Sequence, residues 1–307
     1  MAHSVGIIGM GWVGSSIAIS LLHNGISKHL YLNDVRADIA DGEAMDLRHG
    51  SSFFPAARIR SASVAEMLQC DVIVVTAGRG GKAGESRLEL LQDNISIAKN
   101  ISKELRGYQG ILVIVSNPVD VLTYYYRAFT GLPANRVIGT GTFLDTARLR
   151  ESVGEDLGLE AKSIQADVIG EHGDSAVVLW SGARIGGVPL RNWKQWSAEK
   201  ESEIENKVVG AAQQIIRRKG ATNHAIGLVT AYLVKYLLRD DRRVICVSSV
   251  MEGPYGLSDV ALSLPSIISS EGLVQVLEPE LDDSEKQGLL ASAKVLSRAI
   301  TEARLSS

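Results

Sequence analysis

Residues 5–22 read VGIIGMGWVGSSIAISLL, and this stretch is the clearest indication of fold class in the 307-residue chain. A short apolar strand, Val5–Ile8, runs into a G-x-G-x-x-G turn that opens an apolar helix, Ser15–Leu22. In a dinucleotide-binding βα unit the first glycine permits the tight turn, the second lets the backbone approach a pyrophosphate, and the third allows close packing of helix on strand. The sequence therefore predicts a phosphate site at the N-terminus of this helix. The residues expected to touch the cofactor are Gly9, Gly11, Trp12, Val13 and Gly14.

An acidic residue follows the second predicted strand. Asp34 directly follows the segment His29–Asn33 and stands 20 residues after Gly14. A carboxylate there can accept hydrogen bonds from the adenosine ribose hydroxyls and would repel a 2′-phosphate, so we expect NAD rather than NADP. Arg36, two residues further on, is a feature that could meet a 2′-phosphate. The alternative is a ligand-free turn with an acid that caps the next helix, but strand, turn, helix and acid occur together here.

Two further runs complete a parallel-sheet pattern in the first half of the chain. Residues 71–76 and 111–116 are rich in Val and Ile, as expected of strands covered by helices on both faces. We predict the α/β class, with a Rossmann-type doubly wound parallel sheet in residues 1–141 and an α+β substrate domain in residues 142–307. In the second half we expect helices at 144–157, 197–219, 225–238 and 283–304, strands at 165–169 and 176–185, and a hairpin from 244–250 to 255–264.

Composition excludes several classes of function. A net charge of −3, a pI near 6.1 and the lack of a Lys/Arg run provide no basic surface for nucleic acid. There is no run of 18 apolar residues, and the apolar N-terminus lacks a positively charged segment, so we expect neither a membrane span nor a signal peptide. The two cysteines, Cys70 and Cys246, have no metal-ligand spacing. We therefore predict a cytoplasmic protein without a metal and without nucleic-acid or membrane partners.

Residues 78–87, GRGGKAGESR, leave the carboxyl end of the strand at 71–76, where ligands bind in open α/β sheets. Four glycines indicate a loop that could close over a substrate. Arg87, at the end of the loop, could then bring its guanidinium to a carbonyl oxygen. A flexible surface loop with a solvated arginine is the alternative, and this segment alone does not separate the two.

Two other segments carry groups suited to acid–base chemistry. Asp145 and Arg148 lie three residues apart on a predicted helix, and hence on one face of it. His172 lies in GEHGD at a predicted strand end, and an imidazole titrates near neutrality. Taken singly, a surface salt bridge and a structural histidine are the simpler interpretations.

Five motifs together resemble the lactate/malate dehydrogenase family in order and spacing. They are TAGRGGKAGESRLELLQDN (76–94), SNPVD (116–120), GTFLDTARLR (141–150), GEHGDS (170–175) and KGATNHAIGL (219–228). The chain is most similar to the lactate dehydrogenase branch, especially to bacterial enzymes that act on lactate or bulkier 2-hydroxy acids. The resemblance implies an NAD-dependent L-2-hydroxyacid dehydrogenase whose substrate is pyruvate or a bulkier 2-oxo acid such as 2-oxoisocaproate. Malate dehydrogenase is the alternative, and a non-catalytic NAD-binding protein is the third interpretation.

The resemblance implies a role for each residue near the reacting atoms. His172 would be the catalytic acid and base, with Asp145 fixing its tautomer and stabilising the imidazolium. Arg148 would bind the substrate carboxylate bidentately, and Arg87 would polarise the C2 carbonyl. Asn117 would hydrogen-bond the substrate beside the nicotinamide, and the Asn–Pro bond that follows it is expected to be cis.

The remaining matches concern the cofactor and the assembly. Ala77, Gly78 and Ile226 would touch the cofactor, and Thr222 would line the pocket for the substrate side chain. Members of the family are mostly homotetramers and less often homodimers, so the resemblance implies a homo-oligomer.

One position departs from the family. Gly81 stands where lactate enzymes usually carry Gln and malate enzymes carry Arg. Glycine removes the counter-charge that a second carboxylate needs, so we expect oxaloacetate to be a poor substrate and bulkier 2-oxo acids to fit. Ala221, where many lactate enzymes have Tyr, also favours larger substrates. Arg79 and Lys82 leave the point open, because either could restore a positive charge.

A second departure concerns regulation. Some bacterial relatives are activated by fructose 1,6-bisphosphate through an Arg and a His at a subunit interface. Arg150 matches the arginine, but Gln165 stands in place of the histidine. We therefore expect no such activation.

Overall fold

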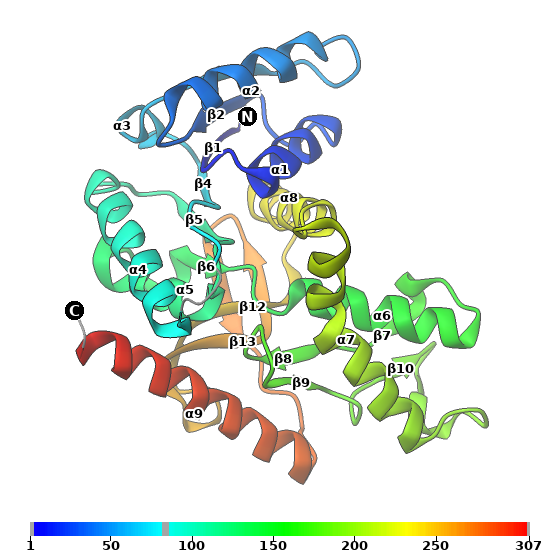
Figure 1. Ribbon diagram of the computed structural model, residues 1–307. Coiled ribbons are helices and arrows are strands. Elements are labelled where there is room, and N and C mark those ends of the chain that lie inside the picture. The colour runs from blue at the N-terminus through cyan, green and yellow to red at the C-terminus, as the bar shows by residue number, and fades with distance from the viewer. Residues whose placement is uncertain (1–2, 82–85, 306–307) are drawn as a thin grey trace.

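The computed structural model describes residues 3–81 and 86–305, and of Arg87 it describes the backbone alone. Its first half contains β1 (Ser4–Ile8), α1 (Trp12–His23), β2 (His29–Asn33), α2 (Ala37–His49), β3 (Arg58–Ser61), α3 (Val64–Met67), β4 (Val72–Val75), α4 (Arg87–Glu104), β5 (Ile111–Ile114), α5 (Val119–Thr130) and β6 (Val137–Gly139). Its second half contains α6 (Phe143–Leu157), β7 (Ile164–Gln165), β8 (Val168–Gly170), β9 (Ala176–Val178), β10 (Arg184–Ile185), β11 (Val188–Pro189), α7 (Ala198–Lys219), α8 (His224–Arg239), β12 (Arg243–Glu252), β13 (Ser258–Ser269), β14 (Gly272–Val276) and α9 (Asp283–Leu305). Figure 1 shows helices on both sides of a central sheet, which confirms the α/β class.

The first six strands have the doubly wound order β3-β2-β1-β4-β5-β6. They are parallel, with Val72 of β4 opposite Val5 of β1 on one side and Ile111 of β5 on the other. The strand order reverses between β1 and β4, so the chain leaves these two strands toward opposite faces of the sheet. In open α/β sheets a ligand binds at this switch point, outside the carboxyl ends of the strands. The predicted Rossmann-type sheet is thus confirmed.

Alternate side chains of the parallel strands enter two different cores. Ile7 and Val74 pack with α1, α2 and α8, whereas Ile8 and Ile73 pack with α4, α5 and α9. Burial on both faces is the reason that these strands read as unbroken apolar runs. Each fully buried aliphatic side chain stabilises the fold by roughly 1.5–3 kcal/mol. The two layers of helices therefore fix the carboxyl ends of the parallel strands along one edge of the sheet.

The same sheet continues into the second half of the chain through antiparallel strands. β12 joins β6 through the pair Ser248–Gly139, and β13, β8 and β9 follow in order. β12 and β13 are the predicted hairpin, and they place β8 beside the Rossmann half. A third core, which includes Val153 of α6 and Val208 of α7, lies in this half. The domain boundary at residue 141 stays a prediction.

Two predicted strands are wrong in their extent. Residues 165–169 divide between β7 and β8, which belong to different sheets. Residues 176–185 form β9 and β10, which belong to different sheets because the chain turns between Trp180 and Ala183. The buried Trp180 indole donates to Glu205 on α7 at 2.6 Å, which draws this turn into the core. Within residues 3–81 and 86–305, no helix has both the length and the apolar character needed to cross a membrane.

Candidate active site

The turn between β1 and α1 has the shape that a pyrophosphate requires. Gly9 adopts a φ of +102°, and a Cβ on it would lie 2.6 Å from the amide nitrogen of Ala77. A Cβ on Gly14 would lie 2.0 Å from the carbonyl oxygen of Gly9, so the helix could not approach the turn as closely. A Cβ on Gly11 would meet nothing within 4 Å, and no side chain caps α1 at this residue. The open N-terminus of α1 therefore fits an anionic phosphate group.

Asp34 lies at the carboxyl end of β2, beside the same turn. One carboxylate oxygen accepts from the backbone N–H of Met10 at 2.8 Å, and the other accepts from the backbone N–H of Arg36 at 3.0 Å. These bonds hold the acid at the strand end, where a ribose would lie in this fold. Glycine turn and acid together therefore fit the phosphate and sugar of a dinucleotide.

Three groups predicted from separate motifs come together in the second half of the chain. His172 follows β8, and its Nδ1 lies 2.5 Å from Oδ2 of Asp145 on α6. Arg148, one turn further along α6, donates from Nη1 to Oδ1 of the same carboxylate at 2.9 Å. Because Nδ1 faces the carboxylate, Nε2 is the ring nitrogen left for proton exchange.

The electrostatics favour an ionised acid beside a protonated imidazole. Burial opposes the charge on Asp145, but the charge of His172 and then that of Arg148 outweigh it and lower the pKa of the carboxyl. Burial likewise opposes the charge on His172, but the attraction of Asp145, with a smaller one from Asp120, raises the pKa of the imidazole above its usual 6.5. The pair is therefore poised to hold a proton on His172 near neutral pH.

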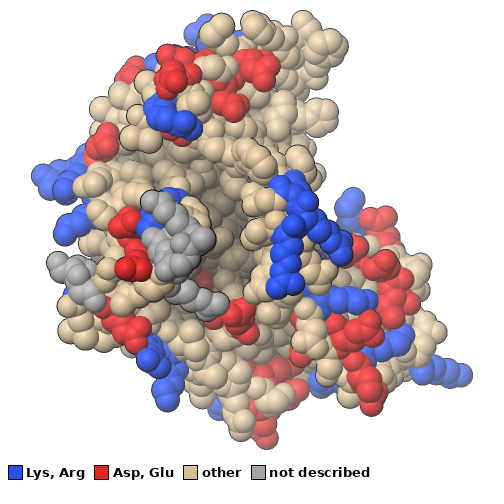
Figure 2. Space-filling model, viewed as in Figure 1, with Lys and Arg blue, Asp and Glu red and all other residues tan. Residues whose placement is uncertain are grey.

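These groups line a cavity of about 440 Å³. Asn117 follows β5 and also lines it, and the bond from Asn117 to Pro118 is cis, as expected. Figure 2 shows the surface hollowed at its centre, with Lys and Arg side chains along one rim. A small cavity that contains an imidazole, a guanidinium and an amide is suited to a small anionic substrate.

Sequence reasoning missed one wall of this cavity, which α7 provides. The residues are Val208, Val209, Ala212 and Gln213. Their spacing marks one face of a helix, and this is the signal that the sequence contains. It does not reveal what that face meets, because α7 comes to the cavity through its packing on α6 and β8 in the third core.

Several predicted site residues lie outside the lining of this cavity. Gly81 is exposed, while its neighbours Arg79 and Gly80 do line the cavity. Thr222 lies in the segment between α7 and α8, and Ile226 of α8 is partly buried against the core that contains α1. Their predicted contacts stay predictions.

Arg87 is the first residue of α4, and the preceding Ser86 caps this helix reciprocally with Glu89. The side chain of Arg87, like residues 82–85 with Lys82, lies outside the described part of the chain. Among the described residues, no three His, Cys, Asp or Glu side chains are arranged to hold a metal ion.

Two family models match consecutive parts of the chain. Residues 3–139 match the lactate/malate dehydrogenase NAD binding domain, and residues 142–305 match the alpha/beta C-terminal domain of the same family. The chain belongs to the lactate/malate dehydrogenase family. The dinucleotide that the glycine turn and Asp34 fit is therefore NAD.

Relatives of this family resemble the chain over almost all of its length. It is 44% identical to an L-lactate dehydrogenase of Fervidobacterium nodosum, with 97% of each chain covered. It is 38% identical to L-lactate dehydrogenase 1 of Clostridium acetobutylicum, over 96% of this chain and 97% of that one. The crystal structure of a minor L-lactate dehydrogenase from Enterococcus mundtii in its ligands-bound form is also similar, at 35% identity, with a TM-score of 0.96 and 98% of each chain covered.

Proposed function

We propose that the protein is an NAD-dependent L-lactate dehydrogenase, which reversibly reduces pyruvate or a bulkier 2-oxo acid to the L-2-hydroxy acid. The observation that carries the proposal is the cluster of His172, Asp145 and Arg148 in one cavity with Asn117. The similarity to L-lactate dehydrogenases over almost the whole chain supports the same activity.

In this mechanism each side chain has one task. Arg148 binds the substrate carboxylate with guanidinium N–H groups that Asp145 does not occupy, since the guanidinium has five donors. His172 donates the proton on Nε2 to the carbonyl oxygen, and Asp145 stabilises the imidazolium until then. Arg87 would stabilise the negative charge that develops on this oxygen. The cofactor, when bound, supplies the hydride.

The walls of the cavity favour an apolar substrate side chain. Val208, Val209 and Ala212 of α7 line it, and none of them can pair with a second carboxylate. Gly81 and Thr222 are proposed to contribute space at the same end of the substrate, in line with the family. We therefore propose that 2-oxoisocaproate is accepted beside pyruvate.

Malate dehydrogenase is the second candidate because Arg79 lines the cavity. Its guanidinium is within 2.5 Å of the Asp93 carboxylate on α4, so an acid of the protein itself already balances this charge. A dicarboxylate would compete with Asp93 for the arginine, and oxaloacetate is therefore expected to be the poorer substrate.

A substrate panel tests the proposal. Steady-state reduction of pyruvate, 2-oxoisocaproate, phenylpyruvate and oxaloacetate with NADH should give the lowest kcat/KM for oxaloacetate. His172→Asn should reduce kcat with the best substrate by about 10²–10⁴-fold and leave NADH binding intact. A preference for oxaloacetate would establish malate dehydrogenase instead, and full activity of His172→Asn would refute the assigned acid.

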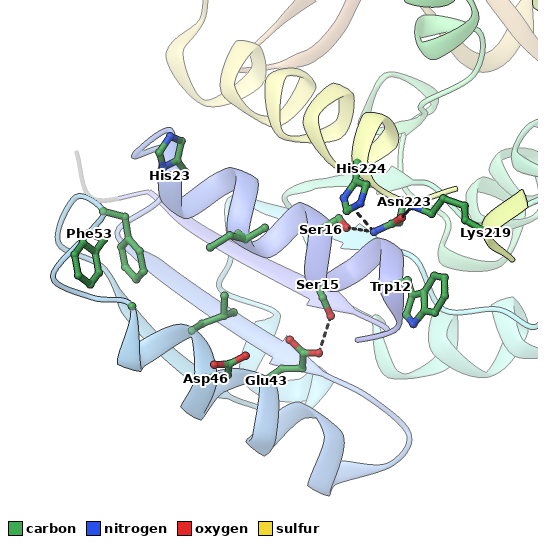
Figure 3. A pocket seen from close by; sticks show the side chains of 14 residues that line it. Trp12, Ser15, Ser16, His23, Glu43, Asp46, Phe53, Lys219, Asn223 and His224 are labelled. Carbon is green, nitrogen blue, oxygen red and sulfur yellow. Dashed lines mark hydrogen bonds between the residues drawn. The ribbon is translucent and has the colours of Figure 1, made fainter. Parts of the chain in front are cut away.

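We also propose that the protein is a homo-oligomer, and a second cavity of about 770 Å³ supports this. It lies between α1, α2 and the junction of α7 with α8, and Figure 3 shows Trp12 and Phe53 at its two ends. Phe53 is 86% exposed and Trp12 is 60% exposed. Exposed aromatic side chains such as these are enriched at protein interfaces. Homotetramer and homodimer are both consistent with it.

Two further proposals, on activation by a sugar bisphosphate and on cellular location, rest on Arg150 and on the two cysteines. Arg150 donates from Nη2 to Asp167 at 2.9 Å and from Nε to the carbonyl of Ala166 at 2.9 Å, so an internal partner already holds the guanidinium. We infer that fructose 1,6-bisphosphate does not activate the enzyme. Cys70 and Cys246 are both free and buried, which suits the reducing cytoplasm proposed as its location.

A further inference from the structure

A second buried carboxylate touches the backbone of His172. Asp120 lies in the first turn of α5, is 2% exposed, and accepts the backbone N–H of His172 at 2.7 Å through Oδ2. Its other oxygen, Oδ1, is buried without a hydrogen-bond partner in the described structure. A buried carboxylate with only one oxygen hydrogen-bonded is costly to the fold, which points to a role beyond packing.

Asp120 connects two parts of the site that are distant in the sequence. It stands three residues after Asn117, on the turn that leads from β5 into α5, whereas His172 belongs to the loop after β8. The hydrogen bond between Asp120 and His172 spans 52 residues and links the segment that carries Asn117 to the loop that carries the proposed proton donor. Asp145 holds the ring of His172, and Asp120 holds its main chain.

Among the described residues, two charged side chains act on the Asp120 carboxylate, and both lie in the loop after β8. The loop after β8 contributes His172, which attracts the carboxylate charge, and Glu171, which repels it, while β12 contributes the neutral Ser248. Asp145 and Arg148 of α6 act on the far side of the imidazole. Burial raises the pKa of Asp120 to about 6, so the acid is mostly ionised at pH 7 and mostly neutral at pH 5.

On the basis of the dehydrogenase function proposed above, we propose that Asp120 is a positioning residue of this active site. Its hydrogen bond sets the place of His172 relative to Asn117, and its negative charge helps to keep the imidazole protonated. Two carboxylates then act on one histidine: Asp145 selects the tautomer, and Asp120 fixes the loop and adds to the field.

Asp120→Asn separates charge from hydrogen bonding, because the amide oxygen still accepts the N–H of His172. In the pH profile of pyruvate reduction, kcat/KM falls on the alkaline side. We expect this fall to begin at a lower pH in the variant, since the imidazole loses one attracting charge. If the fall moves by one pH unit, kcat/KM is about tenfold lower at every pH above it. KM should change less than kcat, because Arg148 still binds the substrate. Asp120→Ala also leaves the N–H unpaired, so kcat should fall further.

Ser249→Ala is the matched control, since it removes a buried hydroxyl from the next position of β12, which does not act on Asp120, and should leave the pH profile in place. A wild-type profile in folded Asp120→Asn would overturn the role of the charge. His172→Asn in the same assays separates the two proposals: if it stays active, the dehydrogenase mechanism fails, and if it is inactive while Asp120→Asn and Asp120→Ala both behave as wild type, only this inference fails.

A measurement on the unaltered enzyme covers the case in which the Asp120 variants do not fold. The chain has six histidines, so selective 15N-histidine labelling yields few backbone amide signals, and His172→Asn assigns the one in question. The amide signal of His172 should move between pH 5 and 6.5 as Asp120 ionises. A signal that stays constant over this range would contradict the proposal.

Discussion

At the scale of single residues, one carboxylate organises the proposed proton transfer. Asp145 is bonded both to Nδ1 of His172 and to Arg148, and it is almost fully buried. Two cationic partners offset the cost of burying this charge, which an isolated carboxylate could not bear. In the proposed mechanism the two partners also differ in task, since His172 exchanges a proton and Arg148 remains charged.

Asp145→Asn should slow pyruvate reduction most at high pH. Reduction needs protonated His172, so activity is present below the pKa of the imidazole and is lost as the pH rises through it. Asp145 raises this pKa, and its removal should move the loss to lower pH and reduce kcat/KM at pH 7.5 by at least about 100-fold. The pH profile of reduction checks the sign. For L-lactate oxidation, which needs the neutral imidazole, the active range should widen to lower pH.

Asp93→Asn should increase the activity toward oxaloacetate. It removes the carboxylate that pairs with Arg79, so more of the positive charge in the cavity becomes available to a second substrate carboxylate. We expect a gain of about tenfold in kcat/KM for oxaloacetate relative to pyruvate. Arg79→Ala should change the ratio in the opposite direction. Equal ratios in all three proteins would mean that Arg79 does not contact the substrate side chain.

At the scale of elements, the turn between β1 and α1 contains Gly11 and Gly14, and the physical reason for glycine differs between these two positions. Gly14 is required by the chain itself, because any Cβ would collide with the carbonyl of Gly9. Gly11 has open space around it, so the described structure alone provides no steric reason for glycine. A ligand that approaches the backbone at Gly11 supplies the reason.

Gly14→Ala and Gly11→Ala should therefore fail in different ways. The first should lower the free energy of unfolding by about 1–3 kcal/mol through overpacking, as measured by urea denaturation. The second should change stability by less than about 1 kcal/mol but weaken NADH binding at least tenfold, as measured by fluorescence titration. If Gly11→Ala binds NADH normally, the pyrophosphate does not lie against this residue.

At the scale of the whole molecule, we propose different roles for the two cavities. The cavity with His172 contains an imidazole, a guanidinium and an amide, while the larger one has exposed aromatic side chains at its two ends, Trp12 and Phe53, and both polar and apolar side chains between them. Figure 3 shows two hydrogen bonds at the larger cavity, in which Ser15 donates to Glu43 and Asn223 donates to Ser16, so these polar side chains already have partners within the chain. This face is therefore the one that we propose contacts a second copy.

Phe53→Asp combined with Met45→Asp should dissociate the oligomer. Both side chains are exposed on or next to α2, and a charge at each would have to be desolvated at the interface. Light scattering after gel filtration should then give a mass close to 33.0 kDa. Val295→Asp on α9 is the control, because it is also an exposed apolar residue but lies away from the cavity. A double variant that keeps the mass of the wild type would place the interface elsewhere.

The parallel sheet, the glycine turn and the cofactor class could all be predicted from the amino-acid sequence, because each depends on backbone geometry within a few residues or on an unbroken apolar run. The sequence also indicated His172, Asp145 and Arg148 as candidates, through motifs that are local. Tertiary structure alone decided which helix closes the cavity, that Asp120 holds the backbone of His172, and that residues 176–185 divide between two sheets. These features depend on which segments meet after folding, and a residue's chain neighbours do not specify its partner 50 or more residues away.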